Sequence, residues 1–253
     1  MNSQLVSIIM PAHNASDTIE DAIESVISQT YKYWELLVID DCSTDETVSL
    51  VQNFVKNDSR IKLLHTDKSL GKPFYPRNIG IENAKGRFIA FLDSDDLWLP
   101  TKLQNQLPLF ESQNVGIVFS YYEKFSFDQD SQKTNRIVKS PGIVTFNSAL
   151  YGNPIGNLTG MYDTKIVGKI FYEDVWHEDY VLWLTILKKG FIAMNTKTVE
   201  ARYRLVRKSV SSNKRKSALW TWNIYRKVLR FNLIQTVFCF TLYLIKGFLK
   251  FLK

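Results

Sequence analysis

Short apolar runs alternate with helical patterns along the first hundred residues. Residues 6–10, 36–39, 61–64 and 88–92 are predicted to form buried strands. The segments between them have apolar positions at the spacing of amphipathic helices. This alternation predicts an α/β fold with a doubly wound, mostly parallel sheet, in which the carboxyl ends of the strands meet at one edge.

Local signals predict where the connecting helices begin. Ser16 is expected to cap the helix that follows the first strand. Ser43 and Glu46 have the spacing of a capping box for the second helix. The third helix is predicted over residues 78–84 and is followed directly by the fourth strand.

The second half of the chain is less regular. Strands are predicted over residues 115–122 and 199–205, and a helix is predicted to begin at Glu178 and to end before Gly190. Loops are predicted at residues 128–136, 151–157 and 207–216.

The net charge of +7 is unevenly distributed. Residues 201–253 hold 13 of the 32 basic residues and no acidic residue. Residues 1–200 therefore hold 19 basic and 25 acidic residues, a net charge of −6. Such a basic end points to an anionic partner: a membrane, a nucleic acid or a phosphorylated substrate. The two cysteines lie far apart, which predicts a reducing compartment and no thiolate zinc site.

The C-terminal segment has the composition of a helix that lies in a membrane surface. Residues 231–245 are uncharged, but these 15 residues fall short of the roughly 20 that span a bilayer. One side of the predicted helix carries the polar residues Asn232, Gln235, Lys246, Lys250 and Lys253, which favours an interfacial helix on an anionic membrane. Packing against the body or a partner subunit and a tilted span are the alternatives. The sequence contains no nucleic-acid-binding motif, so no nucleic-acid partner is expected.

Three carboxylates follow the fourth predicted strand, at Asp93, Asp95 and Asp96. Carboxylates this close repel one another unless a cation or hydrogen-bond donors lie among them. Hard oxygen ligands suit Mg²⁺ or Mn²⁺, which hold substrate phosphates. The pattern is also that of an acidic turn in which Asp96 caps the following segment.

Other polar residues end neighbouring strands at the same edge, namely Asn14, Asp40 and Asp41. A nucleotide is the ligand expected there, with its base and ribose near the first strands. The sequence contains neither G-x-G-x-x-G nor G-x-x-x-x-G-K-[ST], so neither a dinucleotide fingerprint nor a P-loop is predicted.

Short motifs follow one another in a characteristic order over residues 5–215. They are VSIIMPAHN (6–14), SQTY (28–31), ELLVIDD (35–41) with STD (43–45), RN (77–78), FLDSDDLW (91–98) and HEDYVLW (177–183). Together they resemble the GT-A fold glycosyltransferases of the inverting family 2. The resemblance implies a nucleotide-diphosphate sugar donor, most often with UDP, a divalent metal (Mn²⁺ or Mg²⁺) and an acceptor hydroxyl.

The resemblance also assigns roles by position. The nucleotide-sugar-binding residues are expected to be Pro11, Ala12, Asn14, Asp40, Asp41, Lys72, Arg77, Asp93, Ser94, Asp95 and Arg204. Asp95 would also ligate the metal, whose Lewis acidity stabilises the leaving diphosphate. Helix capping by Asp40 and Asp41, and plain solvation of Lys72, Arg77 and a basic loop that includes Arg204, are the alternative interpretations.

Glu178 and Asp179 match the acidic pair of this family. Asp179 would be the general base that takes the proton of the acceptor hydroxyl, Glu178 would orient the acceptor, and His177 is an alternative base. A direct displacement inverts the anomeric centre. The alternative is that both carboxylates only favour the N-terminus of a helix.

Two residues depart from the family pattern. Cys42 stands where glycine is usual and is expected to change the backbone near the base. Pro76, with Pro73, is expected to stiffen a loop over the donor. Tryptophans that could stack on sugar rings or lie in the core are Trp98, Trp176 and Trp183.

We therefore predict a GT-A domain over residues 1–215, with a nucleotide-sugar half (1–98) and an acceptor half (99–215), and a basic amphipathic tail over residues 216–253. The enzyme is expected at the inner face of the cell membrane, on a glycan or lipid-linked acceptor in surface polysaccharide synthesis. A tail-mediated homodimer, an inactive nucleotide-sugar-binding scaffold and a nucleotidyltransferase are alternatives. The last would need a glycine-rich basic loop after the first strand, where residues 11–14 are PAHN.

Overall fold

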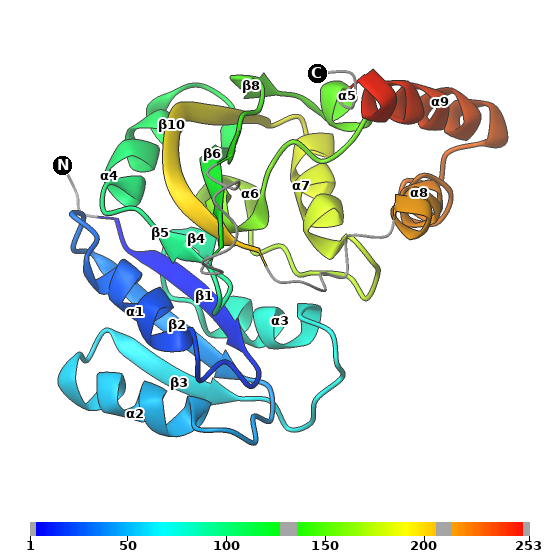
Figure 1. The fold of residues 1–253 in the computed structure, drawn as a ribbon. Helices are drawn as coiled ribbons and strands as arrows, with labels where there is room; N and C mark the ends of the chain where they lie inside the picture. Colours follow the sequence, from blue (N-terminus) through cyan, green and yellow to red (C-terminus); the bar gives the residue numbers. More distant parts are fainter. Residues whose placement is uncertain (1–3, 127–135, 206–213, 250–253) are drawn as a thin grey trace.

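The computed structural model describes residues 4–126, 136–205 and 214–249 (Figure 1). They form a ten-stranded sheet in the order β3-β2-β1-β4-β9-β6-β10-β5, with β7 paired to β6 and β8 to β10. The strands are β1 (Val6–Ala12), β2 (Trp34–Asp40), β3 (Ile61–His65), β4 (Phe88–Phe91), β5 (Leu97–Trp98), β6 (Val115–Phe125), β7 (Arg136–Val138), β8 (Ile143–Val144), β9 (Met161–Asp163) and β10 (Ile192–Arg204).

Helices cover both faces of this sheet (Figure 1). The α-helices are α1 (Ile19–Ile27), α2 (Thr47–Asn57), α3 (Phe74–Asn83), α4 (Lys102–Gln106), α5 (Phe146–Ala149), α6 (Thr164–Val167), α7 (Glu178–Lys188), α8 (Lys214–Asn223) and α9 (Leu233–Leu249). Two 3-10 helices, η1 (Leu107–Glu111) and η2 (Asn157–Thr159), and a π-helix, η4 (Ile224–Val228), complete the described elements.

The first four strands form the parallel, doubly wound part that the sequence predicts. β1 pairs in parallel with β2 and β4, and β2 pairs in parallel with β3. The order of these strands reverses between β1 and β4. A crevice at such a reversal is where open α/β sheets bind ligands.

The second half of the sheet is mixed. β9 runs antiparallel between β4 and β6. The long, curved β10 (yellow in Figure 1) runs parallel to β6. Short antiparallel strands β5, β7 and β8 complete it. The predicted loop at residues 128–136 lies almost wholly outside the described residues, as does the first part of the loop predicted at 207–216.

Alternate residues of the central strands enter two separate cores because successive side chains of a strand point to opposite faces. Ile9 and Ile39 pack with α3 and α7, whereas Ile8 and Val38 pack with α1 and α2. The central strands are therefore buried on both sides, which explains why their sequences are continuous apolar runs.

The predicted helix caps are wrong, although the helices themselves are confirmed. α1 begins at Ile19 after Thr18, and α2 begins at Thr47 after Glu46, neither with a side-chain cap bond. The backbone N–H of Ser16 donates instead to Asp45, and the Ser43 hydroxyl accepts from the backbone N–H of Asn14. These side chains tie the loops after β1 and β2 together.

The third helix begins earlier than predicted, at Phe74. Pro73 precedes its first residue and Pro76 lies in its first turn. A missing N–H costs nothing there, because first-turn amides have no partner within the helix. The prediction that these prolines stiffen a loop is therefore wrong, and they begin α3 instead.

The C-terminal helices share the core of the body. Tyr225 is fully buried and its hydroxyl donates to the carbonyl of Leu150, while Ile224, Leu229 and Cys239 join the core cluster that contains α7. Packing on the body, one of the alternatives for the tail, is thus observed for one side of it. Within residues 4–126, 136–205 and 214–249, no helix has both the length and the apolar character for a bilayer span.

Candidate active site

The carboxyl ends of β1 and β2 are joined to each other by hydrogen bonds. The backbone N–H of Asp41 donates to the carbonyl of Ala12 (2.8 Å), and the backbone N–H of Thr44 donates to the Asn14 side-chain oxygen (2.8 Å). Asn14 has a φ of 48°, a left-handed conformation that asparagine tolerates. Pro11, opposite Ile39 in the register, belongs to the same edge.

Asp40 and Asp41 are both buried, and both carboxylates accept hydrogen bonds. The Asp40 carboxylate accepts the backbone N–H of Ser43 at 3.3 Å, four residues before α2 begins, so it stabilises a turn and does not cap the helix. The Asp41 carboxylate accepts hydroxyls of Thr66 (2.9 Å) and Ser69 (2.8 Å). It thereby fixes the segment that leads to α3.

Cys42 keeps a backbone conformation that suits glycine. Its φ is 60°, in the left-handed region where a side chain costs roughly 1 kcal/mol. The replacement of the usual glycine therefore adds local strain while the turn retains a glycine-like shape.

The acidic turn after β4 is fixed to the end of β10. Asp96 is buried and accepts the backbone N–H of Arg204 at 2.9 Å, while Arg204 Nε donates to the carbonyl of Asp95 at 2.7 Å. Asp96 is followed by the short strand β5, so the helix-cap interpretation is wrong. Arg204 is the last residue of β10 and is buried, not a residue of a solvated loop.

Ser94 lies in this turn between two carboxylates that repel each other. Burial and the charge of Asp93 raise the pKa of Asp95, and burial with the same neighbour raises the pKa of Asp96 further. A divalent cation at Asp95 would relieve this repulsion. Within the described residues no three His, Cys, Asp or Glu side chains form a metal cluster. The donors present suit a metal held by one or two carboxylates and completed by substrate phosphates.

Arg77 connects the acidic turn with the helix that carries the predicted base. Its guanidinium is buried and forms ion pairs with Asp93 (2.6 Å) and Glu178 (2.8 Å). The solvated alternative for Arg77 is therefore wrong. Arg77 is a positioning residue that holds two carboxylates from different halves of the chain.

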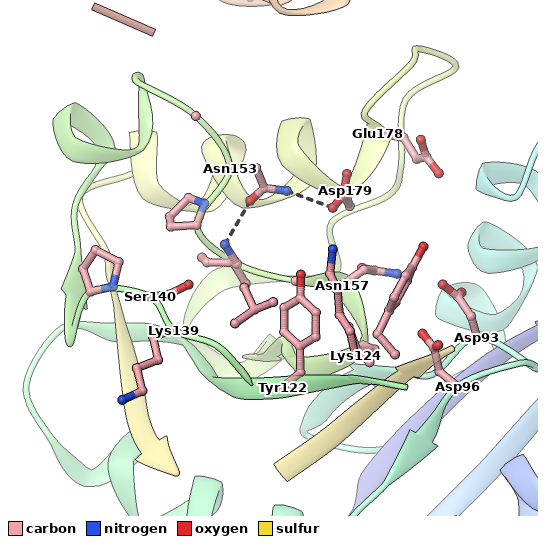
Figure 2. A pocket seen from close by; sticks show the side chains of 18 of the residues that line it. Asp93, Asp96, Tyr122, Lys124, Lys139, Ser140, Asn153, Asn157, Glu178 and Asp179 are labelled. Atoms are coloured by element: carbon pink, nitrogen blue, oxygen red, sulfur yellow. Dashed lines mark hydrogen bonds between the residues drawn. The ribbon is translucent and has the colours of Figure 1, made fainter. Parts of the chain in front are cut away.

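A pocket of about 930 Å³ opens beside this ion-pair network. Figure 2 shows Asp93, Asp96, Glu178 and Asp179 at one end of it. Of the predicted site residues, its walls contain Arg77, Asp93, Glu178 and Asp179. The other predicted nucleotide-sugar residues lie outside its walls, on the strand ends, the adjoining turns and the segment before α3.

Asp179 has the surroundings of a general base. It lies in the first turn of α7, and the Asn153 side-chain amide donates to its carboxylate at 2.8 Å (Figure 2). The Asn153 oxygen accepts from the backbone N–H of Ile155, which fixes the direction of the amide. Burial and the charge of Glu178, against the opposing effect of Arg77, raise the pKa of Asp179 to about 7. A base is most effective when its pKa lies near the working pH.

His177 and Lys72 lie outside the pocket walls. His177 precedes α7 with a φ of 60°, and its ring packs edge-on against Trp220 of α8. Burial lowers its pKa. Lys72 is partly exposed and forms an ion pair with Asp174.

The three candidate tryptophans do not share one environment. Trp98 and Trp183 are buried in the two cores, so they cannot stack on a sugar. Trp176 is exposed but stacks on Trp220, with ring centroids 4.8 Å apart.

Several pocket residues were not predicted from the sequence. Asn153 and Asn157 come from the loop over residues 151–157, whose Asn-Pro and Gly-Asn pairs indicated only a turn. The Asn157 amide nitrogen is buried without a partner in the structure, while its oxygen accepts the Tyr172 hydroxyl at 2.9 Å. Tyr122 and Tyr203 line the wall beside the acidic turn.

Comparison with known proteins gives the family. The profile described as "Glycosyl transferase family 2" matches residues 7–167. The Escherichia coli protein WfgD, a UDP-Glc:alpha-D-GlcNAc-diphosphoundecaprenol beta-1,3-glucosyltransferase, is 41% identical over 225 residues, which cover 88% of this chain and 86% of WfgD.

Two solved structures share the fold. The S. aureus TarS 1-349 complex with UDP-GlcNAc superposes with a TM-score of 0.71 at 18% identity, covering 94% of this chain and 71% of that one. The Pyrobaculum calidifontis mannosyltransferase PcManGT, in complex with GDP-Man and Mn²⁺, gives a TM-score of 0.67 at 18% identity, covering 90% and 64%.

The profile match and the identity to WfgD show that this chain, which has a GT-A fold, is a glycosyltransferase. The chain belongs to glycosyltransferase family 2.

Proposed function

We propose that this enzyme transfers a sugar from a UDP-sugar to a hydroxyl of a lipid-linked saccharide, with inversion of the anomeric centre. The observation that carries the proposal is that Asp93 of the acidic turn and Asp179 of α7 line the same end of the pocket (Figure 2). Donor and acceptor can meet there between a carboxylate suited to the donor side and a carboxylate suited to proton removal.

The chemistry is a single displacement. Asp179 takes the proton of the acceptor hydroxyl as that oxygen bonds to C1 of the donor sugar, and the bond from C1 to the diphosphate breaks with its electron pair on the leaving oxygen. Asn153 holds the carboxylate in position through its side-chain amide. Arg77 holds Glu178 beside it, where Glu178 can orient the acceptor.

The donor side is assigned to the strand ends. Asn14 and Asp41 would frame the base and ribose, Asp93 would contact the ribose or the donor sugar, and Lys72 would neutralise a phosphate. Asp95 would hold Mn²⁺ or Mg²⁺, which would offset the charge that develops on the leaving diphosphate. Mn²⁺ in the PcManGT complex and UDP-GlcNAc in the TarS complex support this choice of metal and nucleotide.

The acceptor is assigned to the membrane surface, at its inner face. One side of α9 packs on the body, while the side that carries Ile234 (82% exposed), Phe238 (60%) and Phe248 (65%) is open. Exposed basic residues also lie on α8 and η4, which contact α9: Arg215, Lys216, Arg226 and Lys227. Such a combination suits anionic lipid. The diphosphoundecaprenol acceptor in the name of WfgD supports a lipid-linked substrate in surface polysaccharide synthesis.

A transfer assay tests the proposal. The full chain is incubated with Mn²⁺, a panel of UDP-sugars and a GlcNAc-diphosphate lipid, and the product is analysed by NMR. We expect one UDP-sugar to give a product with inverted configuration. A product with retained configuration, or donor-independent release of the acceptor sugar, would contradict the assignment.

A further inference from the structure

The pocket is lined by basic residues that the transfer chemistry does not use. Lys124 of β6, Lys139 after β7 and Lys246 of α9 line the pocket and come from three separate elements. Figure 2 shows Lys139 across the pocket from Asp93 and Asp96, with Lys124 between them. The carboxylates of the pocket therefore gather at the end away from Lys139.

Helix α9 lines the pocket with the side opposite to its exposed apolar residues. Tyr243, Lys246 and Gly247 line the pocket, and a Cβ at Gly152 on the facing loop would lie 3.8 Å from the Tyr243 ring. The same helix exposes Ile234 and Phe238. One helix thus forms both a pocket wall and the face proposed to contact lipid.

We propose that Lys139 and Lys246 bind the diphosphate of a polyprenyl-diphosphate-linked acceptor, with the lipid leaving the pocket along α9. The proposal rests on the function proposed above and adds the place of the acceptor's charged group. Ammonium groups bind phosphates as strong, charge-assisted donors. The pocket volume of about 930 Å³ leaves room for a sugar between these lysines and Asp179.

The arrangement also separates the two diphosphates of the reaction. The donor diphosphate belongs at the acidic turn, where a metal at Asp95 would neutralise it. The acceptor diphosphate would otherwise compete for that site. A basic subsite away from the acidic turn holds the acceptor in one direction, with its sugar toward Asp179.

Calorimetric titration of the full chain with farnesyl diphosphate tests this subsite. UDP and Mn²⁺ are kept saturating so that the donor site is occupied. The test variant is K139Q/K246Q. The matched control is K165Q/K188Q, which removes two exposed lysines outside the pocket walls. Thermal melting of each variant confirms that it is folded.

We expect K139Q/K246Q to weaken farnesyl diphosphate binding by about 10- to 100-fold, because two charge-assisted contacts are lost. The control should bind within twofold of wild type. Farnesol should bind weakly and equally to all three proteins. Inorganic pyrophosphate should show the same dependence on the two lysines, with lower affinity, since it lacks the lipid chain.

Two results would overturn the subsite. One is an unchanged affinity of K139Q/K246Q for farnesyl diphosphate, and the other is equal binding of farnesol and farnesyl diphosphate by wild type. The titration needs no turnover, so it is independent of the transfer assay. Failure of sugar transfer with lysine-dependent binding would reject the proposed function alone.

Discussion

Replacing Arg77 by methionine should destabilise the protein far more than the loss of an ordinary surface ion pair. The guanidinium is buried, with only 6% of its side chain exposed, and it holds Asp93 and Glu178 at 2.6 and 2.8 Å. Methionine keeps much of the volume but leaves two carboxylates without their cation. Such orphaned charges dominate the cost of breaking a buried pair.

The magnitude follows from the exposure of the partners. Breaking a fully buried pair costs about 3–5 kcal/mol. The side chains of Asp93 and Glu178 are 31% and 16% exposed, so water offsets part of the loss. We therefore expect a decrease of about 2–4 kcal/mol in the free energy of unfolding. For a chain of this size that corresponds to a melting temperature lower by roughly 5–15 °C.

Urea unfolding of the free protein measures the effect, with K72M as the matched control. Lys72 and Asp174 form an exposed pair, so K72M should cost less than about 1 kcal/mol. In R77M/E178Q one orphaned charge is removed, and part of the stability should return. A loss below about 1 kcal/mol in R77M, or no recovery in R77M/E178Q, would refute the view that Arg77 holds these carboxylates through their charge.

Three further predictions concern the metal, the base and α9. Asp95→Ala should abolish Mn²⁺-dependent UDP binding in calorimetry, while Asp174→Ala should not; retained metal dependence would exclude Asp95 as the ligand. Folding raises the pKa of Asp179 to about 7, so the folded state holds a proton that the unfolded chain has lost, and stability falls as the pH rises from about 4 to 7. Asp179→Asn should therefore melt higher than wild type at pH 8 and show a smaller gain at pH 5; a lower melting temperature at pH 8 would contradict this. Wild type should bind anionic vesicles, and high salt should release it only partly. The variant I234S/F238S/F248S should lose most of this binding, whereas L70S/I143S/I166S, with changes at exposed apolar positions elsewhere, should retain it. Equal vesicle binding by the two variants would reject the α9 face as the membrane contact.

The parallel part of the fold could be predicted because its sequence signals are redundant. Four apolar runs, two helical spacings and polar strand ends all agree on one arrangement. The caps failed because serines and acids near strand ends have competing partners across the sheet edge. Ser43, for example, accepts a hydrogen bond from Asn14 and leaves α2 uncapped, and no local pattern reveals this long-range choice.

The sequence indicated candidate site residues, but not the hydrogen bonds and ion pairs that link them. The acidic turn and the Glu178–Asp179 pair stand out as motifs, whereas the hydrogen bond from Asn153 to Asp179 joins segments 26 residues apart. The link through Arg77 joins residues 101 positions apart. The tail shows the same limit, since its composition indicated an amphipathic helix but not that Tyr225 fills the core beside α7.

The assignment of Asp179 as the base is tested most directly by the pH dependence of sugar transfer in wild type and Asp179→Asn. Donor affinity is measured in parallel so that effects on the donor site are separated from effects on the base. In wild type the acceptor kcat/KM should fall about tenfold per pH unit below pH 7, because only ionised Asp179 accepts the proton. The variant should bind the donor like wild type, transfer about 10²- to 10⁴-fold more slowly, and show no inflection near pH 7. Transfer by Asp179→Asn at a near wild-type rate, with the same inflection, would contradict the mechanism.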